Sequence, residues 1–224
     1  MNKSTQISDS VRLGLLLAIN GGFMDAYSYV FRGKVFANAQ TGNLLLLGMH
    51  MFEGEWNDCI RYIVPIIAFM IGIACAFVLR KKFLDSSKVH WRQVAILIEA
   101  IVLFVVSFIP QSSNLLANSL ISLGCGLQVE SFKKIHGLGA STTMCIGNLR
   151  SATTYFCEYF YSKNAQELEK GFLFIILIVF FVSGAIIGNI FIKGLGQHAI
   201  IICTILLLVG FTAMFIDKEE TRTD

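Results

Sequence analysis

Long apolar runs separated by short polar segments dominate the pattern of the chain. Each run approaches the roughly 20 residues that a helix needs to cross the hydrocarbon core of a bilayer. The composition agrees, with 55% hydrophobic residues, 15% charged residues and a mean hydropathy of +0.67. The pattern predicts an all-α polytopic membrane protein that forms one membrane domain over residues 1–224. The apolar runs cover residues 11–31, 61–80, 93–109, 114–131, 171–192 and 198–216.

Two further segments, residues 34–53 and 139–161, decide the number of crossings. If both cross the membrane, eight Lys and Arg lie inside and ten outside, against the positive-inside tendency. If both dip in and return, fourteen lie inside and four outside. The sequence therefore favours about six transmembrane helices plus two re-entrant half-helix segments, with both termini cytoplasmic; eight crossings remain the alternative. The four outer cations are Arg32, Lys34, Arg61 and Lys193, and the loop cluster that carries most of the contrast is Arg80, Lys81, Lys82, Lys88 and Arg92.

The same arrangement of polar residues occurs once in each half of the sequence. Asp25 is followed eighteen residues later by Asn43, and Glu130 is followed eighteen residues later by Asn148. Each copy places an acid near the end of an apolar run, then a Gly-Asn turn, then a new apolar run. Because each half then contributes three crossings, the second half enters the membrane upside down, as in inverted-repeat transporters and channels. The expected repeats cover residues 11–109 and 114–216, approximately.

A further match lies in the third element of each half. Gly72-x-x-x-Ala76 aligns with Gly184-x-x-x-Gly188 after a seven-residue insertion. Small residues at this spacing let helices approach closely. Ordinary packing explains this match fully, without any functional pairing.

Three short motifs resemble a known family. They are Gly22-Phe23-Met24-Asp25-Ala26, Phe36-Ala37-Asn38-Ala39-Gln40-Thr41-Gly42-Asn43 and Gly147-Asn148-Leu149-Arg150. In order and spacing they resemble the YoaK-type family of small bacterial inner-membrane proteins, over essentially the whole chain. That family is defined as a domain of unknown function, so the resemblance implies a multi-pass protein of the bacterial inner membrane and supplies no substrate. The second copy has Ile146 where the first has Thr41, so any role of that hydroxyl would be one-sided.

The two turns have a chemistry of their own. Gly42 and Gly147 allow backbone conformations closed to other residues, and Asn43 and Asn148 can cap or satisfy the amides that are freed where a helix starts. Each half-helix would point its positive dipole end at the centre, which favours an anion or a substrate carboxylate. Arg150 would add a full positive charge. The other interpretation is a dry, tightly packed fold in which these groups satisfy one another.

Three acids within or near the apolar runs need a reason, because an ionised carboxylate at mid-membrane costs about 3 kcal/mol or more. Glu99 is the deepest, Asp25 lies past the expected midplane, and Glu130 is one helical turn from Lys133 and so could sit at the interface. Any of them could carry protons. Alternatively, Asp25 or Glu130 could form a structural ion pair with Arg150.

The sequence excludes several classes of function. No nucleophile is set beside a base, so we expect no catalytic residues and no enzyme. The cysteines and histidines are scattered without metal-ligand spacing, so we expect no metal and no cofactor. No basic surface interleaved with aromatic residues suggests nucleic acid. The expected partners are the lipid bilayer and a small-molecule or ion substrate, and homo-oligomerisation is left open.

These features together predict a membrane transporter or channel for a small solute, anionic or proton-coupled, with its site where the two Gly-Asn turns meet near the midplane. The alternative is a non-transporting membrane partner or assembly factor whose polar turns are structural. The expected proton-carrying or charge-pairing residues are Asp25, Glu99 and Glu130. The expected substrate-binding residues are Asn38, Gln40, Thr41, Gly42, Asn43, Gly147, Asn148 and Arg150.

Overall fold

The computed structural model describes residues 11–83, 90–135 and 137–223. These residues form α-helices joined by short loops and contain no β-strand, which confirms the all-α class. Lys3 and Lys88, which entered the charge argument, lie outside the described residues. The helices are α1 (Val11–Phe31), α2 (Gln40–Glu53), α3 (Trp56–Phe83), α4 (Trp91–Val106), α5 (Asn114–Ser131), α6 (Cys145–Ser162), α7 (Ala165–Leu195) and α8 (Ile201–Thr223), with short 3-10 helices η2 (Gln111–Ser113) and η3 (Gly196–Ile200).

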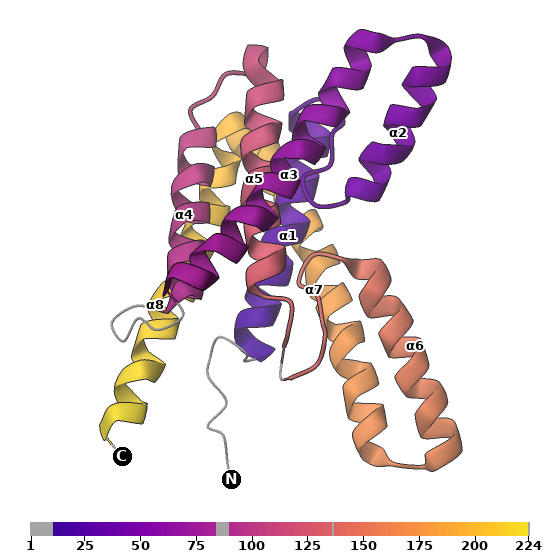
Figure 1. Ribbon diagram of the computed structural model, residues 1–224, viewed down its shortest axis with the longest axis vertical. Coiled ribbons are helices and arrows are strands. Elements are labelled where there is room, and N and C mark those ends of the chain that lie inside the picture. Colours follow the sequence, from indigo (N-terminus) through magenta and orange to yellow (C-terminus); the bar gives the residue numbers. More distant parts are fainter. Residues whose placement is uncertain (1–10, 84–89, 136, 224) are drawn as a thin grey trace.

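The helices pack in pairs around a central bundle. α1 packs along α7, α3 packs along α5, and α4 contacts α5 and α8. Figure 1 shows two hairpins that lean away from the bundle, α2 with α3 and α6 with α7. α2 and α6 both begin in the middle part of the molecule and run towards opposite ends. The start of α1 and the end of α8 lie together at one of these ends.

Helix length separates α2 and α6 from their partners. α2 has 14 residues and α6 has 18, or roughly 21 and 27 Å at 1.5 Å per residue. α3 and α7 have 28 and 31 residues, or roughly 42 and 46 Å. α2 has the length that the re-entrant interpretation predicts for a half-helix, whereas α6 approaches the ~30 Å of the hydrocarbon core. Re-entry into a bilayer itself stays a prediction.

Two helical stretches of the described chain are long and apolar enough to cross a membrane by length and composition alone, Trp56–Phe83 and Ala165–Met214. The second combines α7, η3 and α8. α4 has only 16 residues, and α1 buries polar residues such as Asn20 and Asp25. The count of six crossings therefore stays a prediction.

Four glycines sit where helix backbones touch. A Cβ atom on Gly22 or Gly184 would overlap a backbone carbonyl oxygen across the α1–α7 contact. A Cβ atom on Gly72 or Gly126 would do the same across the α3–α5 contact. Both contacts therefore require glycine, which has no side chain, at these positions, as close helix contacts between small residues do.

The two contacts share one register. Gly22 of α1 lies against Phe181 of α7, and Gly126 of α5 lies against Phe69 of α3. Gly22 and Gly126 therefore occupy equivalent positions, and they are 104 residues apart. Asp25 and Glu130 are 105 residues apart. In the packing of α5, the residue that corresponds to Asp25 is therefore Val129. Glu130 is the next residue, so its side chain points about 100° away from that of Val129 around the helix axis. The expected equivalence of Asp25 and Glu130 is lost, while the inverted repeat as a whole stays a prediction.

Candidate functional site

Asn43 and Asn148 close the loops in front of α2 and α6 in the same way. The Asn43 Oδ1 accepts the Phe36 backbone N–H at 2.9 Å, and its Nδ2 donates to the Phe36 carbonyl at 2.7 Å. The Asn148 Oδ1 accepts the Ser141 N–H at 3.2 Å, and its Nδ2 donates to the Ser141 carbonyl at 2.6 Å. In both copies the partner lies seven residues upstream. Each amide thus satisfies backbone groups that a buried loop would otherwise leave unpaired.

The first loop is held on α1 by Asp25. The Asn38 N–H donates to Asp25 Oδ1 at 2.7 Å. Ala39 precedes α2 and offers no side-chain cap. Asp25 therefore satisfies a backbone N–H of the loop in front of α2 from a different helix. The positive end of α2, expected to attract a substrate anion, faces a carboxyl group of the protein itself.

Both loops converge on one residue of α1, Gly21. The Asn38 Nδ2 donates to the Gly21 carbonyl at 3.3 Å. A Cβ atom on Gly21 would lie 2.5 Å from Thr143 Cγ2, so the loop before α6 packs against the same glycine. Within the described residues, the Thr143 hydroxyl has no hydrogen-bond partner. The segments in front of α2 and α6 thus come together at α1.

A second buried acid is tied to the second loop. Glu99, in α4, is 1% exposed. Hydrogen bonding orients the Gln128 amide with its nitrogen towards this carboxyl group. Gln128 Nε2 then donates to Glu99 Oε1 at 2.8 Å, and Gln128 Oε1 accepts the Thr142 hydroxyl at 3.1 Å. Glu99 is therefore linked to the loop before α6 through Gln128, as Asp25 is linked to the loop before α2.

The two acids have no cation beside them in the described part of the chain. Ion pairs among these residues involve other carboxylates. Cys125 lies close enough to both Asp25 and Glu99 to interact with them electrostatically. An ionised carboxylate without a counter-charge is costly to bury. This central site, Asp25, Glu99 and the loop residues Asn38 and Thr143, is therefore chemically suited to take up a proton or a cation.

The other residues of the first turn have structural contacts. Gln40 Nε2 donates to the Ala37 carbonyl at 2.7 Å, and Gln40 Oε1 accepts from Asn43 at 2.8 Å. A Cβ atom on Gly42 would lie 2.8 Å from the Phe36 ring. Thr41 is exposed. These residues build the start of α2 and lie apart from Glu99.

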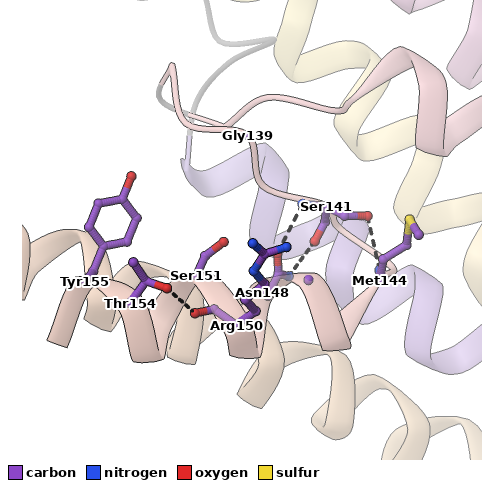
Figure 2. Close-up of a pocket in the computed structure, with 9 residues that line it drawn as sticks. Gly139, Ser141, Met144, Asn148, Arg150, Ser151, Thr154 and Tyr155 are labelled. Carbon is purple, nitrogen blue, oxygen red and sulfur yellow. Dashed lines mark hydrogen bonds between the residues drawn. The ribbon is translucent and has the colours of Figure 1, made fainter. Parts of the chain in front are cut away.

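Arg150 and Glu130 do not join the central site. Arg150 is exposed on α6 and, with Gly147 and Asn148, lines a surface pocket of about 440 Å³, shown in Figure 2. Glu130 pairs with Lys133, one turn along the chain, as its interfacial interpretation implies. Among the described residues neither Asp25 nor Glu130 pairs with Arg150. The structure thus separates the expected site residues into a central group and a surface group.

Sequence reasoning missed a buried arginine. Arg32 is 0% exposed, and its Nε and Nη2 donate to the Tyr27 hydroxyl at 3.0 and 2.8 Å. Its Nη2 also donates to the Val106 carbonyl at 3.1 Å, and its Nη1 to Asn114 Oδ1 at 3.4 Å. The Tyr27 hydroxyl donates in turn to the Gln197 carbonyl at 2.7 Å. Arg32 therefore joins α1 to α4, α5 and η3 through groups that carry no sequence signal.

One group in the described chain has the composition of a metal site. His50, Glu53 and Glu55 place their donor atoms within 4.8 Å of one another at the turn between α2 and α3. His50 Nδ1 already bonds to Glu55 and lies 3.9 Å from Glu53. Both carboxylates are about half exposed, at 54% and 49%. The hydrogen bond between His50 and Glu55 explains the cluster, so we assign no metal to it.

Comparisons with known proteins agree with the resemblance seen in the motifs. A protein-family model described as "Protein of unknown function (DUF1275)" matches residues 13–213. The chain is also 26% identical, over 181 residues, to the UPF0700 transmembrane protein YoaK of Bacillus subtilis (strain 168), a match that covers 77% of this chain and 79% of that protein. No solved structure matches the chain. The match to a transmembrane relative supports a membrane location, and the match over residues 13–213 shows that the protein belongs to the DUF1275 family, whose function is unknown.

Proposed function

We propose that this protein is a transporter that carries a small anionic solute together with protons through the central site. The observation that carries the proposal is the pair of buried acids, Asp25 and Glu99, which lack an ion-pair partner in the described chain. Asp25 is bonded to the loop before α2, Glu99 is linked to the loop before α6 through Gln128, and the two loops meet at Gly21. Discontinuous helices from two halves that meet near the midplane are the usual site of inverted-repeat transporters.

Protons supply the coupling in this proposal. Ionised Asp25 and Glu99 repel an anion at short range, and their repulsion is strong where water is excluded. Proton binding removes that repulsion and also avoids the cost of two ionised carboxylates in the membrane. The anion therefore enters the central site with protons. Asn38 and Thr143, which lie where the loops meet, are the polar groups nearest to its path.

The proposed topology follows from the helix arrangement. α1, α3, α4, α5, α7 and α8 cross the bacterial inner membrane, and both termini are cytoplasmic. α2 and α6 begin at mid-depth and run back to opposite sides of the membrane. The middle start of both helices supports this arrangement, as does the direction in which each then runs. In this role Asn43 and Asn148 shape the loops, and they contact the solute less directly than Asn38.

Uptake driven by a pH gradient tests the proposal. The full-length protein in liposomes is expected to accumulate radiolabelled L-lactate, a small anion, when the outside is more acidic. Asp25→Asn and Glu99→Gln should each lower this uptake at least tenfold, because neither amide can exchange a proton. Glu169→Gln, which removes an exposed acid at the start of α7, is the matched control and should leave uptake unchanged. Uptake that is equal in all three variants would contradict proton coupling through the central site.

One observation favours the second candidate, a non-transporting membrane partner or assembly factor. The polar groups of Asn43, Asn148 and Asp25 are bonded to loop backbone, as a dry packed fold requires. Single cysteines at Asn38 and Thr143, in a protein without other cysteines, distinguish the two functions. Under transport both should react with a small hydrophilic thiol reagent, each mainly from its own side of the membrane. If neither reacts while a cysteine at exposed Glu55 does, the loops are dry and transport is rejected.

A further inference from the structure

We propose a second site, apart from the central one, in which the pocket between α6 and the loop in front of it, residues 139–144, binds a phosphate group. Figure 2 shows this pocket, with Ser141 on the loop and with Arg150, Ser151 and Tyr155 on α6. Its volume of about 440 Å³ lies within the roughly 300–1,000 Å³ of ligand pockets. The proposal does not depend on transport, because binding at this pocket requires no movement of the central loops.

The two loops are closed by the same asparagine bonds but differ in how the space beside the helix start is filled. The residue seven positions before the asparagine is Phe36 in the first copy and Ser141 in the second. A Cβ atom on Gly42 would lie 2.8 Å from the Phe36 ring, whereas a Cβ atom on Gly147 would have nothing within 4 Å. The second copy thus has a serine and open space where the first copy has a packed aromatic ring.

The same comparison shows a buried amide with an N–H to spare. Asn43 Nδ2 donates to two oxygens, a loop carbonyl at 2.7 Å and Gln40 Oε1 at 2.8 Å. Asn148 Nδ2 donates to one oxygen in the described chain, the loop carbonyl at 2.6 Å, and Cys145 stands where the first copy has Gln40. Asn148 is 3% exposed and lines the pocket. Its second N–H is therefore a donor that a ligand can use.

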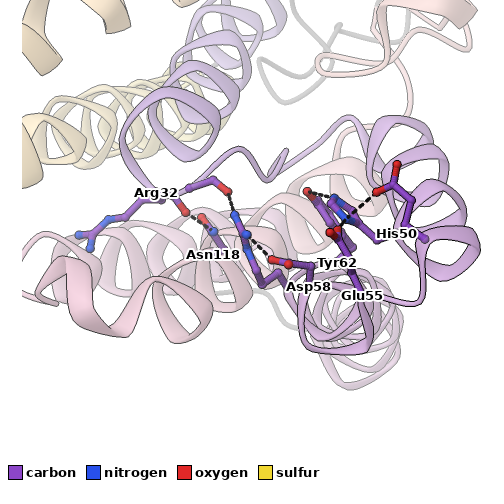
Figure 3. A network of polar contacts seen from close by, with 9 residues as sticks. Arg32, His50, Glu55, Asp58, Tyr62 and Asn118 are labelled. Carbon is purple, nitrogen blue, oxygen red and sulfur yellow. Dashed lines mark hydrogen bonds and ion pairs between the residues drawn. The ribbon is translucent and has the colours of Figure 1, made fainter.

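Arg150 supplies a positive charge that is accessible and not neutralised. It is exposed, and it forms no ion pair with any described residue. By contrast, Arg32 donates to the Tyr27 hydroxyl. Arg61 pairs with Asp58, and Figure 3 shows Asp58 and Arg32 in one network of polar contacts. A guanidinium group with all its N–H donors available matches the oxygen atoms of a phosphate.

The hydroxyl groups of the pocket have hydrogens to donate. Ser141 Oγ accepts the backbone N–H groups of Thr143 and Met144 at 3.3 and 3.1 Å, so its own hydrogen is left for another acceptor. The hydroxyls of Ser151 and Tyr155 form no hydrogen bond within the described chain. A carboxylate has two oxygens, whereas a phosphate ester presents three strong acceptor oxygens. Donors on both the loop and α6 therefore favour a phosphate over a carboxylate.

Calorimetric titration of the purified full-length protein in a neutral detergent tests the pocket with glycerol 3-phosphate, which carries the group that soluble esters and phospholipids share. Glycerate, the carboxylate of similar size, should bind about fivefold or more weakly, and uncharged glycerol should show no binding. Arg150→Gln should weaken glycerol 3-phosphate binding roughly tenfold or more, because it removes charge-assisted hydrogen bonds. Arg12→Gln removes the same charge from an exposed position of α1 and should leave the affinity unchanged.

Two further variants keep the outcomes distinct. Ser141→Phe reproduces the aromatic ring of the first loop and should abolish binding, while the backbone groups that bond to Asn148 remain. Its folding is checked as monodisperse elution, and the Arg150→Gln result stands even if this variant does not fold. Asp25→Asn should bind glycerol 3-phosphate as the native chain does, even where it no longer transports a solute.

Native mass spectrometry of the same preparations separates the two sources of the phosphate. Phosphatidylglycerol that the native protein and Arg12→Gln retain but Arg150→Gln loses would identify a lipid headgroup. Binding of glycerol 3-phosphate to a native protein that retains no such lipid would identify a soluble phosphate. The proposal is overturned if the native protein neither binds glycerol 3-phosphate nor retains the lipid, if glycerate binds as tightly, or if Arg150→Gln and Arg12→Gln behave alike.

Discussion

Gly72→Ala is expected to destabilise the protein strongly, although it adds a single methyl group. The new Cβ atom would overlap the Leu123 carbonyl oxygen, a backbone atom that cannot move without displacing α5. Gly184→Ala should act in the same way at the α1–α7 contact, where the Cβ atom would overlap the Ile19 carbonyl oxygen. Overpacking of this kind typically costs about 1–3 kcal/mol. We expect both variants to give less folded protein.

The measurement is the melting temperature of each detergent-purified variant, followed as the loss of the monodisperse peak in size-exclusion chromatography. A cost of about 1–3 kcal/mol corresponds to a decrease of roughly 2–12 °C for a chain of this size. Gly48→Ala is the matched control, since it adds the same methyl group to α2 with nothing within 4 Å. Alanine is favoured over glycine inside a helix by roughly 0.5–1 kcal/mol, so this control should melt at the native temperature or above it. Equal melting of Gly72→Ala and Gly48→Ala would show that α3 and α5 are not in close contact.

Arg32→Lys is expected to be almost as damaging as Arg32→Leu. The guanidinium group reaches the Tyr27 hydroxyl, the Val106 carbonyl and Asn114 at once. A lysine ammonium is a single point of charge on a flexible stem and cannot take the place of this planar group. The loss leaves buried acceptors without donors, which should lower the free energy of unfolding by about 3 kcal/mol or more.

The same chromatographic assay reads out the Arg32 variants. Arg12→Lys, at an exposed position of α1, is the control and should stay within about 0.5 kcal/mol of the native protein. A native melting temperature for Arg32→Lys would show that charge alone, without the planar geometry, holds α1 to α4 and α5.

The helices could be predicted because the signal that defines them is local. The first apolar run, residues 11–31, coincides with α1. The third element was expected from residue 61, whereas α3 begins at Trp56. Asp58 and Arg61 are polar and interrupt the apolar pattern, but they pair with each other on the first turns of the helix and so allow it to start earlier. Errors of this kind affect helix ends, where polar residues are compatible with both helix and loop.

The site could be predicted only in part, because its contacts are made between distant segments. Asn43 and Asn148 were expected at the helix starts, but their partners are backbone groups of Phe36 and Ser141, which every residue type carries. The link from Glu99 through Gln128 joins α4, α5 and a loop, and no spacing along the chain indicates it. The expected equivalence of Asp25 and Glu130 in the two repeats was lost for a different reason. A shift of one residue keeps the sequence pattern but turns a helical side chain by about 100°.

The position of Asp25 links the charge of one residue to the placement of another helix. Its carboxyl group belongs to α1, whereas the Asn38 N–H that donates to it lies in the loop that leads into α2. A charged acceptor forms hydrogen bonds about twice as strong as a neutral one. The loop in front of α2 is therefore attached to α1 by a hydrogen bond whose strength depends on the charge of Asp25. If Asp25 takes up a proton, as the proposed function requires, the attachment of this loop would weaken at the same residue, without any intermediate element.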